Sequence, residues 1–361
     1  MAIYKDYKRG TYYSSYYFTD YSGKKRRKTK RGFKTKKEAQ EWERHAIMMS
    51  KSDIGMTFGD FIQLYYRDRQ PRLRENTWLH KVNVIETKIL PYFKDRMMND
   101  IMPRDIIAWQ NDILKLRKPD GTPFKDGYLK SIHKHLSCIF NHAVRYYRLP
   151  QNPAAIAGYM SREAPTEMQF WTKEEYQRFA DAAMDDPQHY YAFEVLYWCG
   201  IRYGELRALT VEDFDFENNT LRINKSHQRI GNRDVITPPK TAKSNRIIRM
   251  PRFLAEEMKD YIKSFYHINP TDRIFDFDRH VLHRAMRKYA PIAGVKVIRI
   301  HDLRHSHVSL LIDLGFTALA IADRMGHESI DITFRYAHLF PNKQVEMADR
   351  LDREWGGREV K

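Results

Sequence analysis

The stretch at residues 301–307, His-Asp-Leu-Arg-His-Ser-His, decides how the second half of this chain is interpreted. His301, Arg304 and His305 stand at positions i, i+3 and i+4, so a helix would present all three side chains on one face. His307 instead aligns with leucines at 303, 310, 311 and 314, which predicts a histidine in the core. Three histidines this close could bind zinc. The sequence offers no fourth ligand or open-site carboxylate nearby, so we expect no metal.

A tyrosine follows in a stretch with clear helix boundaries. Residues 325–329 read Met-Gly-His-Glu-Ser, and residues 333–338 read Thr-Phe-Arg-Tyr-Ala-His. Gly326 predicts the end of one helix and Ser329 can cap the next, which places Tyr336 inside that second helix. On its own, Tyr336 would be interpreted as a buried tyrosine with a hydrogen-bonded hydroxyl.

Two basic residues upstream lie in predicted turns. Residues 199–206 read Cys-Gly-Ile-Arg-Tyr-Gly-Glu-Leu, and residues 238–246 read Pro-Pro-Lys-Thr-Ala-Lys-Ser-Asn-Arg, between two predicted strands. Taken alone, Arg202 would form a structural ion pair and Lys240 would lie in a solvated basic turn. Glu205 is interpreted as structural or as an orienter of the groups around it.

Taken together and in order, six residues reproduce the active-site signature of tyrosine recombinases: Arg202, Lys240, His301, Arg304, His327 and Tyr336. The sequence resembles the integrases of temperate phages and conjugative transposons over residues 57–340, and the flanking residues agree with that family. The resemblance implies a mainly α-helical, multidomain fold with small β-sheets. Its parts would be a small β-sheet plus helix, a helical bundle, and a mixed α+β catalytic domain.

The lysine of this signature has three candidates. The hairpin that leads up to the turn is longer than in the shortest members of the family. Lys225, Lys240 and Lys243 could therefore each be the catalytic lysine. Lys240 fits best, because it opens the turn before the strand that reads Ser-x-Arg-x-Ile.

The residue types suit attack on a DNA phosphate. Attack on a phosphodiester adds negative charge to the phosphoryl oxygens, and fixed cations stabilise that transition state more than the ground state. Arg202 and Arg304 are expected in this role, because a guanidinium stays charged and offers a planar fork to two oxygens. His301 and His327 would add hydrogen bonds.

The same signature indicates which residues lose, accept and donate protons. Tyr336 is a phenol with an ordinary pKa of about 10, so it must lose its proton as it attacks, and His301 is the expected acceptor. Lys240 is the expected acid for the departing 5′ oxygen. The product would be a 3′-phosphotyrosine, formed without metal or ATP, and its reversal would rejoin strands so that element DNA is integrated and excised.

Composition agrees with a DNA-binding protein. The 361 residues carry a formal charge of +17, which favours nucleic acid as partner, and the length predicts two or three domains. The two cysteines lack metal-ligand spacing, and Cys138 is interpreted as a small core residue. No disulfide is expected, which fits a reducing cytoplasm. No apolar run approaches the length of a membrane span.

Residues 1–54 predict a small basic domain with 15 Lys/Arg against 6 Asp/Glu. Tyrosine-rich β-forming sequence, a turn at residues 22–23, and Thr35 with Glu38 as a capping box predict a two- or three-stranded sheet followed by a helix. The alternative is a disordered basic arm, which the aromatic content disfavours. The resemblance implies an arm-type DNA-binding domain. Basic residues expected at DNA, here and in the next domain, are Lys24, Lys25, Arg26, Arg27, Lys28, Lys30, Lys130 and Lys134.

Residues 57–153 predict a helical core-binding domain. Helix starts are expected at Thr57, at Asn76 or Thr77, at Pro103 and at Asp126, with Pro91 ending the second helix. An interdomain linker is expected at 154–168 and a catalytic domain at 169–340. In that domain Thr172 caps a first helix, and strands are expected at 220–223, 234–237 and 246–250.

The last segment, 341–361, has apolar residues at helical spacing, including Trp355. The resemblance implies a helix here that docks on a neighbouring subunit, and packing on its own domain is the alternative. Implied partners are double-stranded DNA with core- and arm-type sites, a homotetramer in the synaptic complex, and an excisionase and a host DNA-bending protein. The expected location is the bacterial cytoplasm, at the nucleoid, without a membrane. An inactive regulator with this fold and a topoisomerase with the same strand chemistry are the competing hypotheses.

Overall fold

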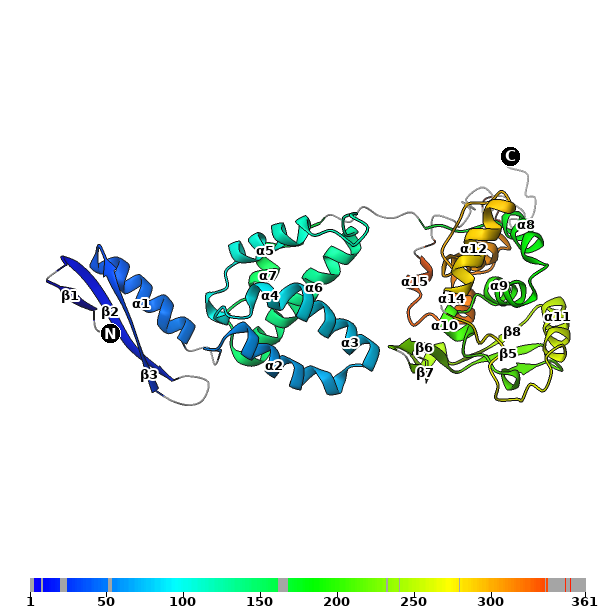
Figure 1. Ribbon diagram of the computed structural model, residues 1–361, viewed down its shortest axis with the longest axis horizontal. Helices are drawn as coiled ribbons and strands as arrows, with labels where there is room; N and C mark the ends of the chain where they lie inside the picture. Colours follow the sequence, from blue (N-terminus) through cyan, green and yellow to red (C-terminus); the bar gives the residue numbers. More distant parts are fainter. Residues whose placement is uncertain are drawn as a thin grey trace, which may run out of the picture. The chain divides into compact units, whose positions relative to one another are not determined.

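The structure is a computed structural model that describes residues 3–7, 9–19, 25–50, 54–161, 168–231, 233–239, 241–278, 280–334, 336, 348 and 351. Contacts divide the chain into two compact units, Met1–Thr166 and Glu167–Lys361, which are described separately (Figure 1). Helices dominate and every sheet is small and antiparallel, so the predicted fold class is confirmed. Lys24, Lys240 and most of the segment 341–361 lie outside the described residues.

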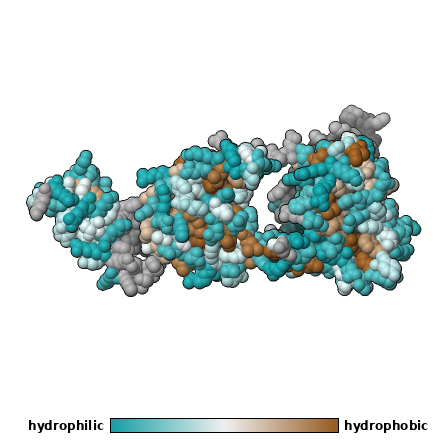
Figure 2. All heavy atoms as spheres, in the orientation of Figure 1, coloured by the Kyte–Doolittle hydropathy of each residue, from teal (hydrophilic) through white to brown (hydrophobic). Residues whose placement is uncertain are grey.

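The first unit begins with a three-stranded sheet and a helix. Strands β1 (Ile3–Asp6), β2 (Thr11–Thr19) and β3 (Lys25–Phe33) pair in the order β1-β2-β3, and α1 (Lys36–Ser50) follows. The predicted capping box is present: the Glu38 amide donates to Thr35 Oγ1 at 3.2 Å, and the Thr35 amide donates to Glu38 Oε2 at 3.4 Å. Figure 2 shows mostly hydrophilic residues over this part of the chain.

One face of this sheet packs against α1. Tyr16 of β2 is buried, and its ring centre lies 6.0 Å from that of Trp42 in α1. Successive side chains of a strand point to opposite faces, and Tyr16 is paired with Lys28, so Lys28 and Lys30 belong to the α1 face. The Lys30 ammonium accordingly lies 5.6 Å from the centre of the Trp42 ring.

The other face of the sheet carries three basic residues of β3, and the side chain of Arg26 lies outside the described part of the chain. Lys25, Arg27 and Arg31 alternate with Lys28 and therefore point away from α1. The guanidinium of Arg27 lies 5.9 Å from the ring centre of Tyr17, and that of Arg31 lies 5.3 Å from that of Tyr13. Strand alternation thus divides the basic run, and only part of it forms the open basic and aromatic face.

A helical bundle makes up the rest of the first unit. Its helices are α2 (Phe58–Arg69), α3 (Glu75–Val84), α4 (Leu90–Phe93), α5 (Pro103–Lys115), α6 (Asp126–Tyr147) and α7 (Pro153–Ala157), with short helical turns between some of them. Large aromatic side chains form the centre of their core, among them Phe58, Phe61, Tyr65, Phe93, Trp109 and Phe140. Burying each such side chain contributes about 1.5–3 kcal/mol, which makes this core the main source of the bundle's stability.

Several helix boundaries of the bundle differ from the prediction. Thr57 caps α2 and Pro103 begins α5 as predicted. Pro91, however, does not end a helix: a π-helical turn at Ile85–Ile89 leads into α4, where proline stands in the first turn and needs no amide donor. Asp126 is the first residue of α6, and Lys125 is its N-cap.

Two further interpretations of this unit were wrong. The linker expected to start at residue 154 begins later, because Asn152 caps α7 through bonds to the amides of Ala154 and Ala155 at 2.9 and 3.0 Å, and Ala154 is buried in the bundle core. Cys138 is exposed rather than in the core, because the buried stripe of α6 runs through Leu136 and Ile139 and passes beside it.

Where the structure describes it, the second unit packs helices around two small sheets. Helices α8 (Lys173–Ala183), α9 (Pro187–Cys199) and α10 (Tyr203–Leu206) precede the strands, and α11 (Arg252–Lys263), α12 (Val281–Ile292), α13 (Asp302–Asp313), α14 (Ala318–Met325) and α15 (Asp331–Phe334) follow them. Strands β4 (Phe214–Asp215), β5 (Thr220–Ile223) and β8 (Arg246–Arg249) form one sheet, and β6 (Ser226–Ile230) pairs with β7 (Arg233–Thr237). The three predicted strands and the Thr172 cap of α8 are confirmed.

Two hydrophobic clusters hold this unit together. The larger one joins α8, α9, α11 and α12 to the β4-β5-β8 sheet. The smaller one consists of Val308, Ile312, Ile321, Met325 and Tyr336, so α13 and α14 bury the tyrosine between them. This small cluster sets the depth of Tyr336 relative to the polar groups at the start of α13.

Candidate active site

The turn after α9 is built around glycine. Gly200 ends α9 with φ +61°, and a Cβ atom there would lie 2.5 Å from the His307 ring. Only glycine fits such a position without displacing the neighbour. His307 is buried, as predicted from its alignment with leucines. The tight contact between these two residues fixes α9 against α13, and it places Arg202 at the start of α10.

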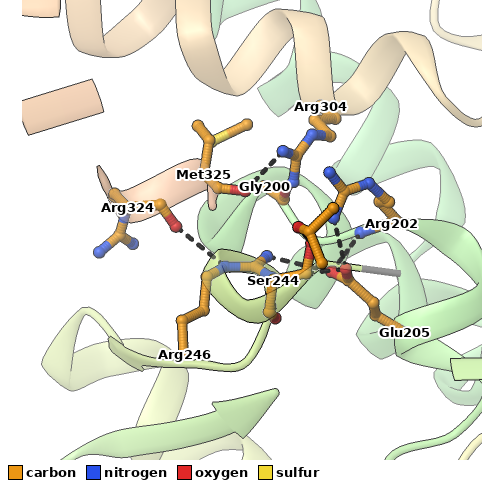
Figure 3. Close-up of polar contacts among 9 residues, drawn as sticks. Gly200, Arg202, Glu205, Ser244, Arg246, Arg304, Arg324 and Met325 are labelled. Atoms are coloured by element: carbon orange, nitrogen blue, oxygen red, sulfur yellow. Dashed lines mark hydrogen bonds and ion pairs between the residues drawn. The ribbon is translucent and has the colours of Figure 1, made fainter. Parts of the chain in front are cut away.

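Glu205 joins two guanidinium groups of this site (Figure 3). Its carboxylate accepts from Arg202 Nη1 at 2.7 Å and from Arg246 Nη2 at 3.0 Å, and it also accepts from the Arg202 amide at 3.0 Å. Burial alone would raise the pKa of Glu205, but the positive charges of Arg246 and Arg202 outweigh it and hold the pKa below its usual value. Glu205 is therefore a buried anion that orients Arg202, which was one of the two predicted roles.

Arg246 connects this cluster to α14. Its Nε donates to the backbone carbonyl of Arg324 at 3.1 Å, and its Nη1 donates to that of Ser244 at 3.1 Å. The side chain is almost fully buried. Arg246 thereby links the turn after β7, the carboxylate of Glu205 and the end of α14, a role that the sequence pattern alone did not assign.

Arg304 is fixed by backbone carbonyls. Its Nη1 donates to the carbonyl of Gly200 at 2.7 Å, and its Nη2 donates to that of Met325 at 2.6 Å (Figure 3). Burial, together with the charge of Arg202, lowers the pKa of Arg304 to about 9, so the group stays positive at neutral pH. Carbonyl oxygens orient a guanidinium without neutralising it, and the site keeps a positive charge suited to an anion.

His327 follows the glycine that ends α14. Gly326 has φ +65°, and a Cβ atom there would lie 2.7 Å from the carbonyl of Lys243, so the turn at 241–244 packs directly on this glycine. His327 is buried, and its Nδ1 lies 2.9 Å from Thr333 Oγ1. Burial and the charge of Arg304 lower the pKa of His327 to about 4.

Tyr336 lies in a turn beyond α15, which ends at Phe334, and not inside the helix as the sequence predicted. Its amide donates to the carbonyl of Thr333 at 3.0 Å, and its side chain is 4% exposed. The hydroxyl forms a short hydrogen bond with Nδ1 of His305, whereas the sequence had favoured His301 as its partner. His301 is the exposed N-cap of α13, and its ring centre lies 5.1 Å from that of His305. The structure therefore places His305, one turn further into α13, against the phenol.

Comparison with known proteins identifies the chain. The family model described as "Phage integrase family" matches residues 169–343, "Phage integrase, N-terminal SAM-like domain" matches 57–114, and "Arm DNA-binding domain" matches 2–48. The chain belongs to the phage integrase family. It is a tyrosine-type site-specific recombinase of the kind that mobile elements carry.

Relatives of this recombinase are integrases of mobile elements. The ICEBs1 integrase of Bacillus subtilis is 28% identical over 339 residues, which cover 88% of this chain and 90% of that protein. The putative prophage phiRv2 integrase of Mycobacterium tuberculosis is 27% identical over 310 residues, covering 83% and 79%.

Solved structures share the fold of this recombinase. The Tn1549 transposon integrase in complex with circular intermediate DNA has a TM-score of 0.67 at 19% identity, covering 83% of this chain and all of that one. A lambda integrase dimer bound to a core site has a TM-score of 0.57 at 17% identity, covering 77% and 97%.

Two of the three lysine candidates of this recombinase have structural partners. Lys225 Nζ lies 2.8 Å from both the Asp213 carboxylate and Thr210 Oγ1, which makes it part of a largely buried ion pair. Lys243 Nζ donates to the carbonyl of Glu328 at 3.3 Å. Lys240 lies outside the described residues, so its assignment stays a prediction, and the anchoring of Lys225 favours it.

The described residues contain no group of three or more His, Cys, Asp or Glu side chains that could hold a metal ion. Among these residues, none of the helices combines the length and the apolar composition that a membrane span requires.

Sequence reasoning did not assign roles to His305, Arg246 and Thr333. Two of them carried a usable signal: His305 stands at i+4 from His301, and Arg246 lies in the Ser-x-Arg-x-Ile strand that was used to place the lysine. Thr333 had no signal, because its contact with His327 depends on how the chain folds back after Gly326.

Proposed function

We propose that this recombinase integrates element DNA into a host chromosome, and excises it again, by cutting each strand with Tyr336. The observation that carries the proposal is the convergence of a buried tyrosine, its histidine partner and two oriented guanidinium groups from α10, α13 and the segment after α14. A phenol beside fixed positive charge is suited to attack a phosphodiester.

Arg304 and Arg202 would bind the scissile phosphate. Carbonyl oxygens fix the first guanidinium and Glu205 fixes the second, so neither needs to reorganise when the five-coordinate phosphorus forms. His327, held through Nδ1 by Thr333, would direct its Nε2 proton to a phosphoryl oxygen. Each such donor typically contributes about 3–4 kcal/mol to the transition state.

The remaining group is the acid that protonates the 5′ oxygen. Lys240 is the proposed donor, because the turn that follows it packs on Gly326 beside His327. The bond energy is kept in the 3′-phosphotyrosine, so a 5′ hydroxyl from another strand can reverse the reaction without ATP. The proposal includes no metal, because the guanidinium groups already supply the positive charge.

The assembly follows from the same proposal. The bundle would bind core-type sites and the amino-terminal sheet would bind arm-type sites, with four protomers in the synaptic complex. An excisionase and a host DNA-bending protein are proposed as accessory partners. The proposed location is the cytoplasm, at the nucleoid.

A suicide duplex that is nicked beside the cut site tests the central step. The junction sequences that flank the gene supply the site, and the adduct is measured on a denaturing gel. Wild type is expected to form a covalent adduct, and Tyr336→Phe is expected to form none while still binding DNA. Absence of an adduct with wild type on every flanking junction would leave an inactive regulator as the better explanation.

Two plasmid assays separate integrase from topoisomerase. A recombinase joins two plasmids that carry partner sites, whereas a topoisomerase only relaxes one of them. Removing residues 1–54 is expected to abolish binding at arm-type sites and to leave core-site cleavage intact. Loss of core cleavage in the truncated protein would contradict the assignment of separate sites to the two parts.

A further inference from the structure

His305 lies between the nucleophile and a buried carboxylate. Its Nδ1 contacts the Tyr336 hydroxyl, and its Nε2 lies 3.8 Å from Asp302 Oδ1. Asp302 is 1% exposed and is held by Arg299, whose Nη2 donates to Oδ1 at 2.7 Å and whose Nε donates to Oδ2 at 3.0 Å. The Tyr336 hydroxyl, the His305 ring and an oriented carboxylate therefore lie in a row, with the histidine and the carboxylate both on the first turn of α13.

The carboxylate of Asp302 beside Nε2 favours the tautomer of His305 that carries its ring proton on Nε2. In that tautomer Nδ1 is an acceptor, and the Tyr336 hydroxyl can donate to it. This is the tautomer that a base must have to take a proton from the phenol, and it presents the resulting cation to a carboxylate.

The charged groups around His305 act in both directions. Burial and the neighbouring His301 lower the pKa of His305 to about 4, and Arg299 and Arg304 act in the same sense, while Asp302 opposes them. The imidazole is therefore neutral before reaction. A bound phosphate would neutralise part of the arginine charge that lowers the pKa of His305. His305 would then accept a proton more readily at the step in which Tyr336 must lose one.

We propose that His305 is the general base that takes the proton of Tyr336 during strand cleavage, an inference that rests on the proposed function. The O–H bond of the phenol breaks and its proton goes to Nδ1. The phenolic oxygen forms the bond to phosphorus, the bond from phosphorus to the 5′ oxygen breaks, and that oxygen takes a proton from the general acid. In the reverse step the His305 imidazolium returns the proton to the departing phenol. His301 then serves the phosphate rather than the nucleophile.

Two substrates distinguish a base from a structural residue. The first is the suicide duplex, in which Tyr336 attacks and must lose its proton. The second is a duplex ending in a 3′-p-nitrophenyl phosphate, which a 5′-hydroxyl strand attacks directly. Its nitrophenolate leaves without a proton, so this joining reaction needs neither Tyr336 nor a group that protonates a phenol. It still needs the guanidinium groups that stabilise the phosphorus.

The variant to compare is His305→Asn, whose amide oxygen can accept a hydrogen bond near the position of Nδ1 but cannot take a proton. Cleavage of the suicide duplex is expected to fall by roughly 10²–10⁴-fold, the usual range for loss of a general base. Joining of the p-nitrophenyl ester is expected to stay within about 3-fold of wild type, since that step bypasses the base. Arg304→Lys is the matched control, because it should slow both reactions.

The outcomes separate the two proposals. Cleavage by His305→Asn at nearly the wild-type rate overturns the base assignment and leaves only a hydrogen bond that positions Tyr336. Equal losses in both reactions, repeated with His305→Gln, would show a structural role and overturn it as well. If wild type joins the p-nitrophenyl ester but never forms a tyrosine adduct, the proposed cleavage by Tyr336 fails first.

Discussion

Replacing Glu205 with glutamine tests whether one buried carboxylate supports both the fold and the catalytic site. Glu205→Gln keeps the shape of the side chain but removes the charge shared by Arg202 and Arg246. The amide group would also bring an N–H donor against guanidinium donors. Arg246 is the more buried partner, with 7% of its side chain exposed, so it would keep its charge without this counter-ion.

Breaking one side of a buried ion pair costs about 3–5 kcal/mol, because the partner stays charged and desolvated. For a unit of this size, that loss corresponds to a fall of roughly 6–20 °C in melting temperature. Arg202 is more exposed and would lose only its orientation. We expect cleavage to slow by roughly 10- to 100-fold, less than the 10²–10³ that follows removal of a transition-state donor.

Glu256→Gln is the matched control. Its ion pair with Arg252 has a similar distance, 2.8 Å, but both side chains are exposed, at 62% and 84%. We expect that change to cost less than about 0.5 kcal/mol and to leave cleavage unchanged. Equal destabilisation by the two substitutions would refute the argument from burial.

Calorimetry measures the stability loss, and the suicide-duplex assay measures the rate. A double-mutant cycle that combines Glu205→Gln with Arg202→Ala separates the effect on stability from the effect on cleavage. If Glu205 acts on cleavage through Arg202, adding Glu205→Gln to Arg202→Ala lowers stability further but slows cleavage no further. Rate losses that multiply in the double variant would contradict orientation of Arg202 as the route.

Three further predictions concern other parts of the chain. Thr333→Val should slow cleavage by roughly 5- to 30-fold, equivalent to about 1–2 kcal/mol, because His327 loses its hydroxyl partner. Thr333→Ser keeps a hydroxyl and should restore the rate. A slow Thr333→Ser variant would show that the hydroxyl is not the group that matters. In the amino-terminal sheet, Arg27→Ala should weaken binding to arm-type DNA in gel-shift titrations more than Lys30→Ala, because the second residue is on the α1 face; the reverse order would place DNA on the other face. Burial lowers the pKa of His307 to about 3, below its unfolded value near 6.5. The contribution of neutral His307 to the free energy of unfolding is therefore complete above about pH 6.5 and falls by about 1.4 kcal/mol per pH unit as the pH drops toward 3. Urea unfolding from pH 7.5 to 4.5 measures this loss, and the same pH dependence in His307→Gln would contradict the prediction.

The sequence by itself determined several of the elements that form in this protein. The helix caps at Thr57 and Thr172 depend on contacts within three residues, so their signals are local. The strand at 220–223 was predicted from its residue types, although its pairing partner β8 lies more than twenty residues further along the chain. The order of the six signature residues likewise indicated the family and the chemistry. Local signals were less reliable where the chain had a second option, as at Pro91, where a widened turn allowed the helix to continue.

Only the tertiary structure decided which side chains meet. His301 and His305 share one helix face, and the sequence cannot say which of them reaches a tyrosine thirty residues away. That choice depends on the depth at which the small cluster of α13 and α14 buries Tyr336. In the same way, Lys225 was a candidate acid until the fold placed Asp213 against it. Spacing along a chain fixes the face of a helix, but packing between helices fixes the distance between atoms, and proton transfer depends on that distance.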